Sequence, residues 1–255
     1  MTAPPVLELE DRLLRAAEPA AFSDAELEGL PEPVRRHLAQ AIAPQTPLAT
    51  SVRLRMRGTI KLGRWLPFRA HQVLDPHHGL VWAARVAGVI AGSDRYLDGA
   101  GGMDWKLLGL VGVAHAEGPD FARSAAGRAG VEGMWVPTAL LPRFGVRWTA
   151  DGPNQVTVRH QLGETPVEVH YQLDAAGRMR SFVLDRWSDP DGTGTFGWYR
   201  FGGEVTGYRT FDGVTIPAAA RAGWNFGTDR WPDGEFIRYR ITDLHLVTAT
   251  GRPSP

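Results

Sequence analysis

Apolar and polar residues alternate along much of the chain from residue 50 onward. Val52, Leu54 and Met56 alternate with three arginines, and a second clear run covers residues 167–173. A period of two is typical of a strand with one buried face and one solvated face. The same reasoning predicts further strands near residues 65–74, 79–87, 93–98, 104–116, 156–162, 178–187, 196–209, 214–226 and 235–247.

Tight turns join several of these strands. Asp191-Gly192, Asp212-Gly213 and Asp233-Gly234 are Asp-Gly pairs, which favour the left-handed backbone that short hairpins require. Strand, turn and strand at this spacing indicate sequential antiparallel pairing rather than βαβ units.

Helical patterns occur in two places. Within residues 6–42, leucines recur at roughly helical spacing, and Ser23 followed by Glu26 predicts a capped helix start. Pro31 and Pro33 predict the opening of a further helix, because proline is tolerated in a first turn. Residues 119–132 interrupt the strands and begin just after a Gly-Pro step that suits a helix entry.

These patterns predict a mainly β fold, in which a curved antiparallel sheet or half barrel surrounds an internal helix. We expect residues 1–48 to form an N-terminal helical segment packed on the main domain. Residues 49–250 are expected to form the antiparallel β domain, with the inserted helix near residues 119–132.

Composition narrows the possible partners and cofactors. The formal net charge is +0, without the basic excess of a nucleic-acid or anionic-membrane binder. The chain has no cysteine, which excludes disulfides and thiolate metal sites and fits a cytoplasmic location. No run of about 18 uncharged apolar residues is present, so we expect no membrane insertion. Residues 1–22 have no basic head followed by an apolar run, so we expect no signal sequence.

Arg128 and Glu132 are the first candidates for chemistry. On a helix they share one face with Phe121 and Trp135. A structural ion pair is the favoured interpretation. The alternative is an active pair, in which Glu132 serves as acid or base and Arg128 anchors an anion.

His115 and His160 each share a predicted strand face with valines. A hydrogen-bonded core histidine is the favoured interpretation of each, and a proton carrier is the alternative. Histidines 71, 77 and 78 lie around a turn, where three or four converging metal ligands are rare. We therefore expect neither a metal site nor another cofactor.

Aromatic residues are abundant, especially in the second half of the chain. They can line a ligand cavity or equally form a packed core. The aromatic residues proposed as ligand contacts are Phe121, Trp135, Tyr171, Trp187, Trp198, Tyr208 and Trp224.

Several segments resemble a bacterial family classed as a domain of unknown function. The most specific is the Trp-Val-Pro-Thr-Ala-Leu-Leu-Pro block at residues 135–142, supported by residues 30–36, 107–110, 145–148 and 208–214. Arg128 and Glu132 match an Arg and a Glu four residues apart in that family. The resemblance covers about residues 30–247 and implies a fold but no established activity.

A weaker resemblance is to the outer-membrane lipoprotein carriers and related lipid-binding half barrels. The closing pattern at residues 211–217, then Trp224 and residues 236–239, is similar to their last strands. Those proteins are exported and usually carry a signal sequence, whereas none is expected here, so the resemblance does not imply a periplasmic role.

The leading functional hypothesis is therefore binding of a hydrophobic small molecule or lipid-like ligand inside the curved sheet. The second is a cofactor-free enzyme, such as an isomerase, cyclase or hydrolase, that uses the same cavity. The third is a structural or interaction module. The sequence leaves the ligand, any reaction and the oligomeric state open.

Overall fold

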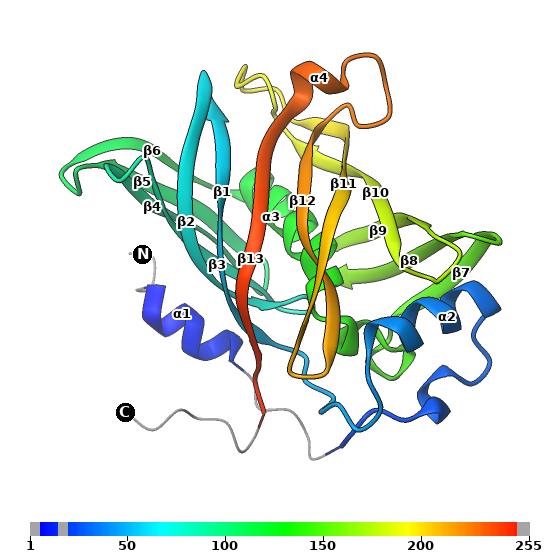
Figure 1. Ribbon diagram of the computed structural model, residues 1–255. Coiled ribbons are helices and arrows are strands. Elements are labelled where there is room, and N and C mark those ends of the chain that lie inside the picture. Colours follow the sequence, from blue (N-terminus) through cyan, green and yellow to red (C-terminus); the bar gives the residue numbers. More distant parts are fainter. Residues whose placement is uncertain (1–5, 15–19, 249–255) are drawn as a thin grey trace.

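The computed structural model describes residues 6–14 and 20–248 (Figure 1). Thirteen strands of these residues form one antiparallel sheet. In chain order they are β1 (Val52–Leu62), β2 (Arg64–Asp75), β3 (Gly79–Val86), β4 (Ile90–Leu97), β5 (Ala100–Leu107), β6 (Val111–Glu117), β7 (Arg147–Gly152), β8 (Gln155–Leu162), β9 (Thr165–Leu173), β10 (Met179–Ser188), β11 (Gly197–Phe211), β12 (Val214–Trp224) and β13 (Glu235–Leu246).

The strand order across the sheet is β6-β5-β4-β3-β2-β1-β13-β12-β11-β10-β9-β8-β7. Two runs of sequential neighbours thus meet where β1 pairs with β13. The sheet curves strongly, and within the described residues its end strands β6 and β7 do not pair with each other (Figure 1). The predicted mainly β fold, a curved antiparallel sheet around an internal helix, is confirmed.

Helix α3 (Pro119–Glu132) occupies the concave side of the sheet, behind β1, β13 and β12 in the view of Figure 1. Its bounds agree with the predicted helix. Alanines and glycines cover its buried side, and Gly130 faces Val167 of β9 so closely that a Cβ at position 130 would lie 2.6 Å from both valine methyls. Small residues therefore allow the helix backbone to approach the sheet.

The chain after α3 continues as three 3-10 turns, η2 (Gly133–Trp135), η3 (Pro137–Leu140) and η4 (Pro142–Phe144). The first two are buried inside the curve, whereas η4 has no buried residue. Thr138 and Trp148 anchor this segment: the threonine hydroxyl donates to the Ala49 carbonyl, and the indole N–H of Trp148 donates to the Leu140 carbonyl. The specific block at residues 135–142 thus lies in the buried centre of the fold.

The N-terminal segment forms α1 (Val6–Leu13), η1 (Asp24–Leu27) and α2 (Glu32–Ala41). Leu9 and Leu13 of α1 pack on β2, β3 and β4. The predicted helix start at Ser23 is wrong, because Ser23 makes no side-chain cap hydrogen bond and only a single 3-10 turn follows. Gly29, with φ +75°, then redirects the chain before α2 begins at Glu32.

Two strand predictions needed revision. The predicted strand at 104–116 is two strands, β5 and β6, because Leu108 and Gly109 adopt positive φ in a hairpin turn. The short strand β7 was not predicted. In addition, Val111 and Val113 are exposed, since β6 is an edge strand that protrudes from the sheet.

The close contact between α3 and β9 predicts that Gly130→Ala destabilises the protein by about 1–3 kcal/mol, since the new methyl overpacks against Val167. Chemical denaturation measures the change. Gly112→Ala is the matched control, because nothing lies within 4 Å of a Cβ at that exposed position and little change is expected. Equal stability of Gly130→Ala and the wild type would refute the overpacking.

Candidate functional site

A hollow of about 220 Å³, here called the inner cavity, lies between α3, η2 and the concave face of the sheet. Most of its wall is apolar and buried, including Met56, Val131, Phe182 and Phe201. Its rim is the partly exposed group Ile60, Trp224, Phe236 and Ile237, on β1, β12 and β13. The inner cavity lies inside the curve of the sheet, where the sequence analysis expected a ligand to bind.

One charged group inside the cavity is fully paired. The Arg128 guanidinium donates from Nε to Glu132 at 2.8 Å and from Nη1 to Asp94 at 2.7 Å, and it lies 4.7 Å above the Trp82 ring. Gln72 donates to the other oxygen of Glu132, and Trp105 to the other oxygen of Asp94. All four carboxylate oxygens thus accept hydrogen bonds.

Electrostatics keep Arg128 charged. Burial alone would lower the pKa of Arg128, but the attraction of Glu132 and Asp94 outweighs burial and raises that pKa above its ordinary value. Arg128, Glu132 and Asp94 thus form one hydrogen-bonded ionic network, which contributes the polar part of the cavity wall.

A second cation, Arg186 of β10, also lines the cavity. Its Nε donates to the Ser124 carbonyl at 3.2 Å and its Nη2 to the Ser124 hydroxyl at 3.4 Å. Within the described residues, no carboxylate lies within ion-pair distance of it. Burial first, and then the nearby charge of Arg128, lower the pKa of Arg186 to about 10, so that it remains protonated at neutral pH.

Some buried polar atoms at the cavity lack a hydrogen bond within the described part of the chain. The indole nitrogen of Trp135 and the hydroxyl of Tyr239 face each other, with their ring centroids 5.3 Å apart. The indole nitrogen of Trp82, which lines the cavity, and the side-chain oxygen of Gln72, whose amide nitrogen binds Glu132 at the cavity wall, have no such partner. Such atoms are normally satisfied by a protein group, water or a ligand.

Four of the residues selected from the sequence meet at this cavity: Arg128, Glu132, Trp135 and Trp224. The structure adds residues that the sequence analysis missed, chiefly Arg186, Trp82, Asp94 and Tyr239. Arg186 carried a sequence signal, since it lies on the same face of β10 as the buried residues Phe182 and Leu184. The others come from separate strands and have no shared local pattern.

The two candidate histidines do not reach the inner cavity. The His115 side chain is 64% exposed on β6, 3.6 Å from Asp104, instead of facing inward. His160 contacts His77, whose ring in turn contacts Phe144. Burial, with a smaller contribution from the charge of His77, lowers the pKa of His160 to about 4.

The remaining aromatic candidates also lie elsewhere. Tyr171 is buried against His37 and Trp148, and the Tyr208 hydroxyl donates to the Met179 carbonyl. Three candidates lie around the first turn of α3: Phe121 packs on Phe196, and Trp187 packs on Trp198 while donating to Asp120.

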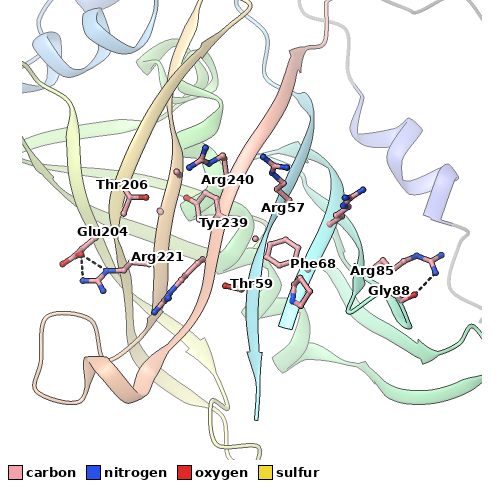
Figure 2. Close-up of a pocket in the computed structure, with 16 residues that line it drawn as sticks. Arg57, Thr59, Phe68, Arg85, Gly88, Glu204, Thr206, Arg221, Tyr239 and Arg240 are labelled. Carbon is pink, nitrogen blue, oxygen red and sulfur yellow. Dashed lines mark hydrogen bonds and ion pairs between the residues drawn. The ribbon is translucent and has the colours of Figure 1, made fainter. Parts of the chain in front are cut away.

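A broader hollow of about 1360 Å³ lies on the outer face of the sheet (Figure 2). Arg85, Arg69, Arg57 and Arg240 are directly opposed across β3, β2, β1 and β13. None of these four forms an ion pair with another described residue, whereas Arg221 pairs with Glu204. This face is the solvated side predicted from the alternating arginines of β1.

The described residues contain neither a cluster of metal-ligating side chains nor a membrane-spanning helix. No group of three or more histidine, cysteine, aspartate or glutamate side chains is placed there to hold a metal ion. No helix in that part of the chain is both long and apolar enough to cross a membrane.

Comparisons with known proteins place the chain among similar sequences and folds. A family model described as "Family of unknown function (DUF6544)" matches residues 20–236. No curated protein matches the chain. The family match agrees with the first resemblance identified in the sequence. The second resemblance, to the lipoprotein carriers, corresponds to the solved structures described next.

Two solved structures are similar in fold. One is a putative outer membrane lipoprotein-sorting protein domain from Vibrio parahaemolyticus, with 10% identity, a TM-score of 0.44, and coverage of 87% of this chain and 93% of that one. The other is a LolA superfamily protein from Nitrosomonas europaea, with 8% identity, a TM-score of 0.44, and coverage of 89% and 94%.

Removing the charge of each cavity arginine should affect stability to different extents. Arg128→Met is expected to lower the free energy of unfolding by about 3 kcal/mol, because Asp94 and Glu132 lose their shared cation. Arg186→Met removes a cation without an ion pair and should change stability by less than about 1 kcal/mol. Urea denaturation compares the two, and equal losses would contradict this assignment.

The pKa of His160 predicts acid sensitivity. Between pH 6.5 and about 4 the unfolded chain binds a proton at this residue that the folded chain does not, so the free energy of unfolding falls as pH drops, by at most about 3 kcal/mol. His160→Phe should flatten this slope in denaturation series at several pH values. His115→Phe is the control and should leave the slope unchanged, because that side chain is exposed.

Proposed function

The chain belongs to a family of unknown function, and we propose that it binds a small hydrophobic molecule in the inner cavity. The observation that carries the proposal is the inner cavity itself, which combines buried apolar walls with a few polar groups, including the unpaired indole nitrogen of Trp82. This combination is characteristic of small-molecule sites, where apolar contact supplies affinity and polar groups fix orientation.

The size of the cavity limits the ligand. Known ligand pockets span roughly 300–1,000 Å³, and an engineered apolar cavity of about 150 Å³ binds benzene. At about 220 Å³, the inner cavity accommodates a single ring system or a short alkyl chain. The partly exposed rim gives such a molecule a route to the interior, because Trp224 and Phe236 lie between solvent and the buried wall.

Binding explains the site better than catalysis does. The cofactor-free enzyme hypothesis placed Glu132 as acid or base and His115 or His160 as proton carrier. Glu132 has both oxygens engaged by Arg128 and Gln72, and neither histidine lines the cavity. A proton-transfer site requires a group within hydrogen-bond reach of the substrate, and these residues offer no such pair.

Filling the cavity tests the proposal. Ala222 of β12 lines the inner cavity, so Ala222→Phe should weaken binding of octan-1-ol at least tenfold in calorimetric titration, because the new ring takes up the space of the ligand. Ala219→Phe is the control, since Ala219 lies on the same strand but lines the outer hollow. Near-ultraviolet circular dichroism checks that both variants fold.

Two results would contradict the proposed binding in the inner cavity. If the wild type binds neither octan-1-ol nor toluene, and native mass spectrometry of gently purified protein shows no retained molecule, the proposal is wrong. Equal binding by Ala222→Phe and the wild type would place the ligand outside the inner cavity.

A further inference from the structure

Arg186 is the exception in an otherwise apolar strand face. On β10, Phe182 and Leu184 point to the concave side and are buried, and Arg186 is the next residue on that face. An arginine at such a position loses much of its hydration, which is costly unless hydrogen bonds and opposite charge replace the water.

The protein itself replaces the water only in part. Two N–H contacts go to Ser124, at 3.2 and 3.4 Å, whereas a guanidinium has five N–H donors in a fork that suits bidentate binding of an anion. Asp94 and Glu132 attract Arg186 only from beyond ion-pair distance, and all their oxygens are already engaged. Arg186 therefore has donors to spare and no paired anion among the described residues.

The position of the guanidinium is also favourable for a ligand. It lies 5.4 Å from the ring centre of Phe201 and 5.5 Å from that of Trp224, which belongs to the rim. Aromatic faces hold a cation in place without neutralising it. Opposite them, α3 has Gly127, where a Cβ would lie 3.3 Å from Cγ of Arg186, so the helix leaves room for this side chain.

We infer that the inner cavity binds an anionic amphiphile, whose carboxylate pairs with Arg186 near the rim and whose hydrocarbon part fills the apolar interior. This inference rests on the proposed function and names the class of its ligand. The polar end belongs beside Arg186 and Trp224, and the apolar end belongs against Val131 and Phe182.

Cavity volume sets the length of the hydrocarbon part. If about 150 Å³ accepts a six-carbon ring, then the same ratio gives room for about nine carbon atoms in the inner cavity. A medium-chain carboxylate such as octanoate matches this size. A sulfate head group has the same charge and also accepts bidentate hydrogen bonds, so octyl sulfate tests whether Arg186 selects a carboxylate or any compact anion.

Titration calorimetry with octanoate and octan-1-ol separates head-group recognition from tail binding. Wild-type protein is expected to bind octanoate at least tenfold more tightly than octan-1-ol. Arg186→Met should remove this preference, so that octanoate binds no more tightly than octan-1-ol. Arg180→Met is the matched control, because Arg180 lies on the same strand but is exposed, and it should keep the wild-type preference.

The outcomes separate this inference from the proposed function. Binding of octan-1-ol without a preference for octanoate, or a preference that persists in Arg186→Met, overturns the anionic ligand and leaves hydrophobic binding intact. If neither ligand binds the wild type, the proposed function fails and this inference falls with it. Equal binding of octyl sulfate and octanoate supports recognition of any compact anion by Arg186. Tighter binding of octanoate than of octyl sulfate supports recognition by Arg186 with a preference for a carboxylate.

Discussion

The close contact of α3 with the concave face of the sheet is the constraint on which the remaining structure depends. Gly130 brings the helix backbone against Val167, closer than any residue with a side chain would allow. That contact determines where the last turn of α3 lies, and with it Arg128, Glu132 and the start of η2. Because a helix cannot fill a curved sheet evenly, close packing at one strand leaves space elsewhere, and the inner cavity lies in that space.

Two arginines in one cavity illustrate how partners decide what a residue does. Arg128 has two carboxylates, an aromatic face and a helix to hold it, so its charge is neutralised locally and serves the fold. Arg186 has the same side chain, but among the described residues its guanidinium hydrogen-bonds to Ser124 and lies over two aromatic rings without forming an ion pair. The positive charge of Arg186 is therefore available to a bound molecule, whereas that of Arg128 is not.

Local patterns were sufficient for much of the fold. Most strands followed from alternation, because alternation reflects one buried face. The helix at residues 119–132 followed from the break in that alternation and from the Gly118-Pro119 step at its start. Ser23 misled because a capping pattern says nothing about whether a helix continues. The cavity was less predictable: Trp82, Asp94 and Tyr239 meet only through strand order, and His115 faces solvent because β6 is an edge. Arg186 could have been found, since a cation on an apolar strand face is a local signal.

The pairing of the first strand with the last has a consequence for how the chain reaches its native state. The strands on either side pair with their sequence neighbours and can form by local steps, but Arg55 of β1 meets Thr242 of β13 across 187 residues. Joining such distant segments is the slow event in folding, because a long loop must close first. During synthesis, one edge of β1 and one edge of β12 therefore remain unpaired until β13 leaves the ribosome. Premature association between nascent chains would begin at these unpaired edges.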